Sequence, residues 1–192
     1  MISHKHRFIF VHAGRTGGTS FERIAGQDVT NDERTKHLGN TDFDGKHLGF
    51  QYYQRAFPSE FKTFFKFTIV RNPFDRLVSQ WFWRTTVIKD HQGMSLKEFI
   101  LTRHESSKYS EKFKLSGFSI NDSLKQFDYI GRFEDLHNTY RYLLEKLNIQ
   151  QTDMVYSNKT IHNNYQDYYT AETIDIVNVK YGLDLELFDY KF

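Results

Sequence analysis

Three glycines and three hydroxyl side chains surround one arginine near the start of the chain. The segment consists of Gly14, Arg15, Thr16, Gly17, Gly18, Thr19 and Ser20. A glycine-rich turn before a helix lets backbone N–H groups converge on an anion, and the helix N-terminus adds partial positive charge. Arg15 adds a full charge and a planar set of donors. The segment therefore predicts an anion-binding loop, against the alternative of a tight turn that binds nothing.

This loop departs from the loop that binds nucleoside triphosphates. The Walker pattern places Gly-Lys-Ser/Thr after a glycine and four further residues. Here no lysine precedes Thr19 or Ser20, and the glycine spacing differs. The second apolar run, residues 64–70, ends in Arg71 rather than in a metal-binding aspartate. We therefore expect protein donors to bind the anion without a metal ion.

A second anion site is predicted around Arg71. This residue follows residues 64–70, which read as a strand, and open α/β sheets bind ligands beyond the carboxyl ends of their strands. Ser79 lies two turns into the next helix, on a face that looks back at the same crevice. Arg71 and Ser79 would hold a second phosphate. The alternative is that Arg71 only pairs with Asp75, four residues later.

The elements that must position these residues alternate between strand and helix. Residues 7–12, 64–70 and 127–131 read as short buried strands, and residues 47–57, 96–102 and 136–147 read as helices. Asn72 and Pro73 predict the start of another helix, and Gly182 predicts the end of the last one. The pattern predicts an α/β, P-loop-like three-layer fold, with a short central parallel sheet flanked by helices. The length of 192 residues suits a single domain over residues 1–192.

Composition excludes several classes of protein. The 26 basic and 24 acidic side chains give a net charge of +2, which argues against nucleic acid as a partner. The chain has no cysteine, which excludes disulfides, thiolate catalysis and cysteine metal sites. No stretch approaches the roughly 18 apolar residues of a membrane span, and no export signal is recognisable. We therefore expect a cytoplasmic protein with no membrane partner.

Two motifs resemble those of a known family. Residues 14–20 resemble the 5′-phosphosulfate loop, usually Pro-Lys-Thr-Gly-Gly-Thr-Ser, of sulfotransferases that use 3′-phosphoadenylyl sulfate (PAPS). Residues 70–79 are similar to their 3′-phosphate motif, in the same order and at the same spacing. Residues 127–136 and 168–192 also resemble later blocks of the family. The resemblance is closest to the carbohydrate-type branch, which includes Golgi polysaccharide sulfotransferases and small bacterial relatives.

The resemblance implies PAPS as the sulfuryl donor, 3′,5′-ADP as the product, and transfer to a hydroxyl of a small-molecule or carbohydrate acceptor without a metal. The residues it places at the nucleotide are Arg15, Thr16, Gly17, Gly18, Thr19, Ser20, Arg71, Ser79 and Arg132. For Arg132 the alternative is a pair with Glu134 or Asp135. Arg15 stands where the family usually has a catalytic lysine; arginine stabilises charge on the leaving phosphate but does not readily donate a proton.

A hydroxyl acceptor needs a general base, and the resemblance points to His47. Residues 45–50 are similar to the Gly-His-containing segment of family members that use a histidine. His37 lies in a second copy of the tetrapeptide Lys-His-Leu-Gly and is an alternative, as is Glu60. His12 matches a common family histidine and is expected to be structural or to line the nucleotide site.

Two other functions remain open. A kinase-like phosphotransferase would require magnesium, although its Walker lysine is missing here. A non-catalytic binder of PAPS or of sulfated glycans would bind 3′,5′-ADP and transfer nothing.

Overall fold

The structure is a computed structural model, and it describes residues 1–25, 47–102, 108–150 and 163–192. Its centre is a four-stranded sheet in the order β1-β2-β3-β4. The strands are β1 (Ile2–Ser3), β2 (Phe8–Phe10), β3 (Phe65–Val70) and β4 (Tyr129–Arg132). The pairs β2–β3 and β3–β4 are parallel, whereas β1 pairs with β2 in the antiparallel sense. The three parallel strands correspond to the predicted ones, and β1 was not predicted.

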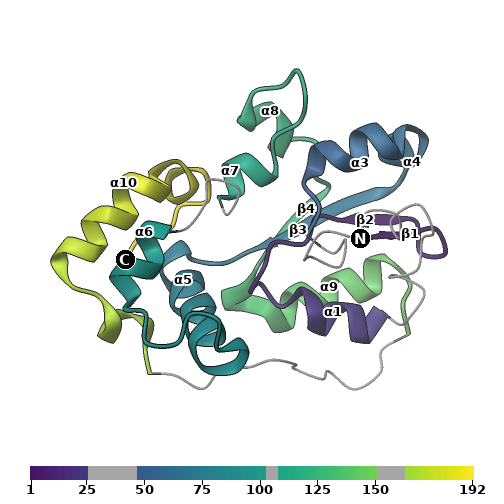
Figure 1. Cartoon of the computed structure of the whole chain (residues 1–192). Helices are drawn as coiled ribbons and strands as arrows, with labels where there is room; N and C mark the ends of the chain where they lie inside the picture. Colours follow the sequence, from purple (N-terminus) through teal and green to yellow (C-terminus); the bar gives the residue numbers. More distant parts are fainter. Residues whose placement is uncertain (26–46, 103–107, 151–162) are drawn as a thin grey trace.

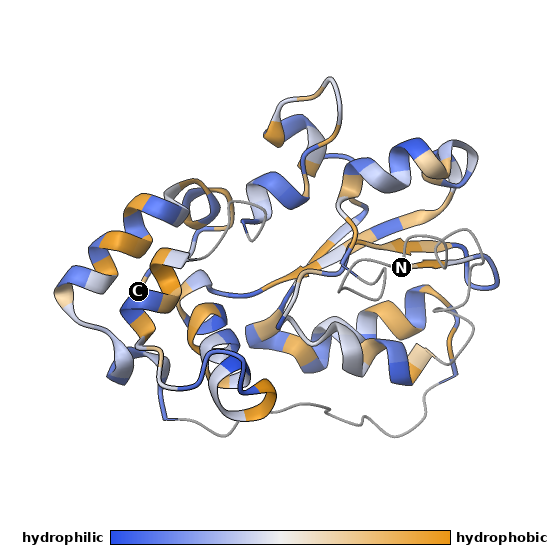
Figure 2. Ribbon diagram, viewed as in Figure 1, coloured by the Kyte–Doolittle hydropathy of each residue, from blue (hydrophilic) through white to orange (hydrophobic). Residues whose placement is uncertain are grey.

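Helices cover both faces of this sheet. The helices α1 (Gly18–Ala25) and α9 (Leu136–Lys146) lie on one face, and α3 (Phe50–Ala56) and α4 (Pro58–Thr63) lie on the other (Figure 1). The architecture is therefore an α/β fold of three layers, which confirms the predicted fold class. The strands are mostly apolar, while the helices around them carry both apolar and polar residues (Figure 2).

The core has two layers because successive side chains of a strand point to opposite faces of the sheet. Phe8 and Phe10 of β2 belong to the cluster that contains Phe21 of α1, whereas Ile9 belongs to the cluster that contains Phe50 of α3. All five side chains are completely buried. Because both faces of β2 are covered, the strand is apolar throughout, as is typical of a parallel sheet.

A second group of helices lies beyond the carboxyl ends of β3 and β4 (Figure 1). It consists of α5 (Pro73–Phe82), η2 (Trp83–Ile88), α6 (Leu96–Thr102), η5 (Tyr165–Tyr168) and α10 (Ala171–Leu187). The remaining elements are α7 (Tyr109–Lys112), α8 (Ile120–Leu124) and η4 (Phe133–Asp135). At the start of α5, the Asn72 side chain accepts a hydrogen bond from the Phe74 N–H at 3.0 Å. This is the cap predicted from the sequence.

The prediction that the last helix ends at Gly182 is wrong. The helix α10 continues through Gly182 to Leu187. Burial of Val177, Tyr181 and Leu185 on the same helix outweighs the cost of about 1 kcal/mol for a glycine inside a helix. Across the described part of the chain, every helix is too short or too polar to span a membrane.

Two glycines offer a matched test of this packing. A Cβ at Gly18 would lie 2.1 Å from Nε2 of His12, a side chain that is itself buried, whereas a Cβ at Gly182 would meet nothing within 4 Å. We expect Gly18→Ala to lower the free energy of unfolding by about 1–3 kcal/mol. Gly182→Ala should raise it by about 0.5–1 kcal/mol. Urea unfolding measures both, and equal effects of the two substitutions would contradict this packing.

Candidate functional site

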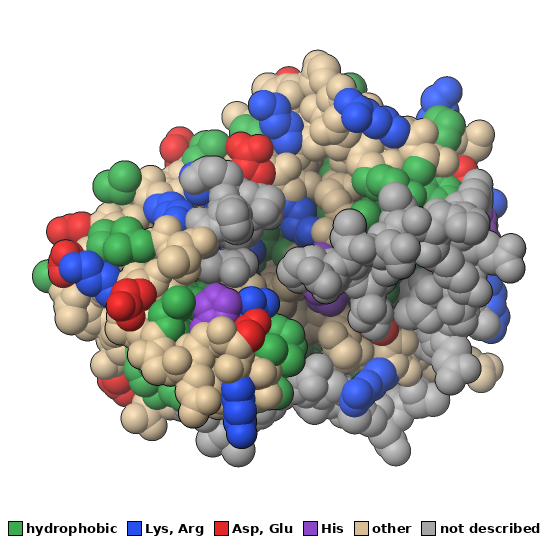
Figure 3. All heavy atoms as spheres, in the orientation of Figure 1, with side chains coloured by type: hydrophobic (Ala, Val, Ile, Leu, Met, Phe, Trp, Pro, Cys, Tyr) green, Lys and Arg blue, Asp and Glu red, His purple; other side chains and the backbone are tan. Residues whose placement is uncertain are grey.

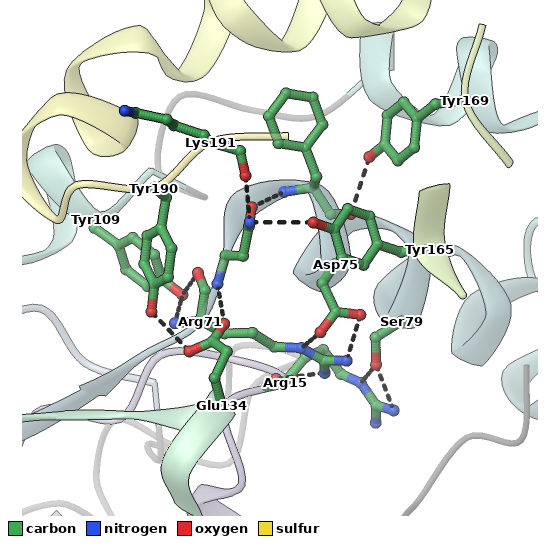
Figure 4. A network of polar contacts seen from close by, with 12 residues as sticks. Arg15, Arg71, Asp75, Ser79, Tyr109, Glu134, Tyr165, Tyr169, Tyr190 and Lys191 are labelled. Carbon is green, nitrogen blue, oxygen red and sulfur yellow. Dashed lines mark hydrogen bonds and ion pairs between the residues drawn. The ribbon is translucent and has the colours of Figure 1, made fainter. Parts of the chain in front are cut away.

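The predicted anion-binding residues meet at one edge of the sheet. The parallel strands β2, β3 and β4 run in the same direction, so the segments that follow them all start at this edge. Arg15 follows β2, and Arg71 directly follows β3; Ser79 lies further along α5 (Figure 4). Basic side chains and histidines surround a hollow in the middle of the face seen in Figure 3.

The glycine-rich loop has a fixed backbone. Gly17 has a φ of +85°, which favours glycine, and its carbonyl accepts a hydrogen bond from the Tyr140 hydroxyl at 2.6 Å. A Cβ at Gly17 would lie 2.7 Å from that hydroxyl oxygen. The buried Thr16 hydroxyl donates to the Ala13 carbonyl at 2.7 Å. Thr16 therefore holds the loop in shape, while Thr19 is only partly buried.

Arg15 of this loop reaches the helix of the second motif. Its Nε and Nη2 atoms lie 3.2 and 3.1 Å from the Ser79 hydroxyl oxygen. The guanidinium also lies 5.7 Å from the ring of Trp83, within the range of a cation–π contact. Burial, and then the charge of Arg71, lower the pKa of Arg15 to about 10, which leaves it charged at neutral pH. The structure thus joins the two predicted phosphate motifs directly.

Arg71 is held on several sides. Its Nε and Nη2 atoms donate to the Asp75 carboxylate at 2.7 and 2.8 Å, and its Nη1 atom donates to the Arg15 carbonyl at 3.1 Å. The ring of Phe133 lies 4.0 Å from the centre of the guanidinium. The ion pair between Arg71 and Asp75, which the sequence left as an alternative, is present. Arg71 nevertheless also lies beside Arg15.

The backbone of Arg71 is bound by a residue that the sequence did not indicate. The Tyr109 hydroxyl accepts from the Arg71 N–H at 2.9 Å and donates to the Arg71 carbonyl at 3.1 Å. Tyr109 begins α7, and the Asp184 carboxylate of α10 accepts from the N–H groups of Tyr109 and Ser110 at 2.6 and 2.8 Å. Asp184 is completely buried. No local pattern in the polar segment 105–114 pointed to these long-range contacts.

His47 lies beside the glycine-rich loop. Its Nδ1 atom is 3.3 Å from the His12 carbonyl oxygen, and a Cβ at Gly14 would lie 3.9 Å from its Cε1 atom. In the tautomer that donates from Nδ1 to this carbonyl, Nε2 carries the lone pair that a base needs. The Lys112 ammonium donates to the His47 carbonyl and so ties α7 to this turn.

The alternative bases lie elsewhere. Glu60 belongs to α4, which precedes the amino end of β3, and its carboxylate is 3.9 Å from the His4 ring. It is therefore at the edge of the sheet opposite the arginines. His37 lies outside the described residues. His12 is buried, with Nδ1 3.9 Å from the Glu22 carboxylate, and its ring packs against Gly18, which favours a structural role.

Arg132 ends β4 at the same edge but is turned toward the end of the chain. Its Nη2 atom donates to the Phe188 carbonyl at 2.6 Å, and its guanidinium lies 4.7 Å from the ring of Tyr190. The alternative, a pair of Arg132 with Glu134 or Asp135, is not seen in the described part of the chain. The predicted role of Arg132 at the nucleotide stays a prediction.

Comparison with protein families matches residues 1–191 to the sulfotransferase family. The chain belongs to the sulfotransferase family. Searches of curated proteins and of solved structures gave no match. Membership confirms the family predicted from the sequence and supports an enzyme that transfers a sulfuryl group. The role of the arginines and hydroxyls at the strand ends in binding anions stays a prediction.

Lys112 provides a test of the contact between α7 and the His47 turn. Burial, and then the charge of Arg76, lower the pKa of Lys112 from 10.5 to about 8. Between these two pH values the unfolded chain binds more protons than the folded one, so the contribution of Lys112 to stability rises with pH. We expect the stability of the wild type relative to Lys112→Met to increase from pH 8 to pH 10, by up to about 1.4 kcal/mol per pH unit.

Urea unfolding at several pH values measures this slope. The matched control is Lys97→Met, because Lys97 is exposed and pairs with Glu172 on the surface. We expect the difference from the wild type to rise more steeply with pH for Lys112→Met than for this control. A flat difference for Lys112→Met would contradict the lowered pKa of Lys112.

Proposed function

We propose that this sulfotransferase uses PAPS and transfers the sulfuryl group to a hydroxyl of a carbohydrate or other small-molecule acceptor, within a single domain of residues 1–192. One observation carries the proposal: two arginines from separate strand ends lie in direct contact, with Arg71 Nη1 3.1 Å from the Arg15 carbonyl oxygen. The charge of Arg71 also contributes to the lowered pKa of Arg15, so the two like charges are close enough to repel, which costs free energy. Two anionic groups on one ligand, such as the 5′-phosphosulfate and the 3′-phosphate of PAPS, offset that cost.

The chain offers separate groups for the two anions. The glycine-rich loop, with Arg15, Gly17, Gly18, Thr19 and Ser20, would hold the 5′-phosphosulfate at the start of α1. Arg71 and Ser79 would hold the 3′-phosphate, and Arg132 would approach the nucleotide from β4. Arginine suits both positions because its planar fork of donors matches tetrahedral anions.

PAPS, when bound, supplies an activated sulfuryl group. In the proposed reaction a bond forms between the acceptor oxygen and sulfur while the bond from sulfur to the 5′-phosphate oxygen breaks. His47 Nε2 takes the proton of the acceptor hydroxyl. The Arg15 guanidinium stabilises the negative charge that develops on the leaving phosphate. No metal is needed for these steps, since positioning and charge stabilisation supply the catalysis.

A thermal-shift experiment tests the nucleotide assignment. With EDTA present and 3′,5′-ADP at about 100 times its Kd, the Tm should rise by roughly 5 °C or more. Arg71→Ala should weaken 3′,5′-ADP binding at least about tenfold and leave adenosine 5′-phosphosulfate, which lacks the 3′-phosphate, nearly unchanged. The absence of any shift would contradict the choice of nucleotide, and equal losses for both ligands would contradict the role of Arg71.

A histidine substitution tests the base. His47→Ala should lower kcat by about 10²–10⁴-fold and leave the Kd for 3′,5′-ADP nearly unchanged, because a base acts on the acceptor and not on the nucleotide. The control is His137→Ala, since His137 is exposed on α9. Assays with labelled PAPS and a panel of sugar acceptors measure both. Full activity of His47→Ala would contradict this role and leave His37 as the candidate base.

A second candidate function is a non-catalytic binder of PAPS. The observation that favours it is Arg15 itself, because arginine does not readily donate the proton that the family lysine can give. Such a protein would bind 3′,5′-ADP and yield no labelled product with any acceptor. Arg15→Lys would then be the variant in which to look for transfer.

A further inference from the structure

The turn that carries Arg71 is held by a carboxylate that the proposed chemistry does not use. The Asn72 N–H donates to Oε1 of Glu134 at 2.7 Å, and the Tyr190 hydroxyl donates to Oε2 at 2.9 Å (Figure 4). Glu134 belongs to η4, and Tyr190 lies in the segment after α10. One side chain thus joins the end of β3 to the end of the described chain.

Asn72 is fixed at its side chain as well as at its N–H. Its side-chain amide donates to the Lys191 carbonyl at 2.7 Å, and its side-chain oxygen accepts from the Phe74 N–H at 3.0 Å. The preceding residue, Arg71, has both backbone polar groups bound by Tyr109. The turn at Arg71 and Asn72 is therefore held by the side chains of Tyr109 and Glu134 and by the backbone carbonyl of Lys191.

The residue next to Glu134 acts on the side chain of Arg71. Phe133 covers one face of the guanidinium at 4.0 Å, and Asp75 and the Arg15 carbonyl bind its edge. An arginine has five N–H donors, so these three bonds leave two. Because the guanidinium plane is already fixed, little conformational entropy is lost when a phosphate binds the two that remain.

A carboxylate near an anion site opposes anion binding through charge repulsion. Any favourable effect of Glu134 on anion binding must therefore come from its two hydrogen bonds and not from its charge. A glutamine at this position keeps an oxygen acceptor for the Asn72 N–H, and its amide N–H can donate to the Tyr190 oxygen. Glu134→Gln therefore removes the charge and keeps both hydrogen bonds, whereas Glu134→Ala removes both.

We propose that Glu134 is a positioning residue that gives the nucleotide site its preference for a 3′-phosphate. It does so by holding the turn at Arg71 and Asn72 through its link to Tyr190, while Phe133 beside it orients the guanidinium. The inference rests on the proposed function, because it assumes that Arg71 binds the 3′-phosphate.

Isothermal titration calorimetry on the full chain tests this with two probes, 3′,5′-ADP and adenosine 5′-monophosphate. The measured quantity is the preference, the ratio of the two Kd values. Glu134→Ala should lower the preference at least about tenfold and change the Kd for adenosine 5′-monophosphate by less than about twofold. Glu134→Gln should keep the preference of the wild type or raise it.

Two further variants sharpen the result. Tyr190→Phe removes only the hydroxyl that binds Glu134 and should lower the preference by a smaller factor, about threefold. Asp135→Ala is the matched control, because Asp135 is an exposed acid on the same turn whose carboxylate binds Asn138. Asp135→Ala should leave the preference unchanged.

The outcomes separate this inference from the proposed function. A wild type without preference for 3′,5′-ADP would overturn both. A wild type with the preference, together with an unchanged preference in Glu134→Ala or equal weakening of both ligands, would overturn the positioning role alone. If Glu134→Ala does not fold, Tyr190→Phe and Glu134→Gln decide. The proposal then requires that Tyr190→Phe lowers the preference for 3′,5′-ADP and that Glu134→Gln retains it.

Discussion

The Arg71 guanidinium lies against the Arg15 backbone at the carboxyl ends of the strands, and the surrounding structure holds both charged residues in place. Their charges repel, which is one reason why the pKa of Arg15 is lowered, after burial itself. The Asp75 carboxylate neutralises Arg71, the Ser79 hydroxyl binds Arg15, and aromatic rings cover a face of each guanidinium. Placing like charges close together costs the unliganded fold some stability, which an anionic ligand would offset under the proposed function.

The parallel sheet makes this arrangement possible. Strands β2 and β3 run side by side in the same direction, so the glycine-rich loop and the start of α5 emerge next to one another. Rings fill both faces of these strands, and Phe10 stacks on Phe67 with ring centroids 4.6 Å apart. The high aromatic content, 17% of residues, thus provides two well-filled core layers around a sheet whose strands are short.

Local sequence signals predicted the elements that bear the site. The glycine-rich turn and the Asn72-Pro73 helix start follow from short-range backbone chemistry, and parallel pairing follows from alternation of strands with helices. Contacts over long sequence separations were not predictable: Tyr109 and Glu134 bind residues 38 and 62 positions away. Gly182 shows the opposite error, because tertiary packing overrides the local preference of glycine to end a helix. The chemical roles of Arg15, Arg71 and His47 stay predictions.

The short helix α7 touches both halves of the proposed reaction. Tyr109, at its first residue, holds the backbone of Arg71, and Lys112, at its last, binds the carbonyl of His47. A helix advances about 1.5 Å per residue, so one turn of helix sets the spacing between these two contacts. Asp184 of α10 fixes the first residue of this turn. In the proposed reaction, a helix outside both binding motifs would therefore set the distance between the nucleotide site and the base.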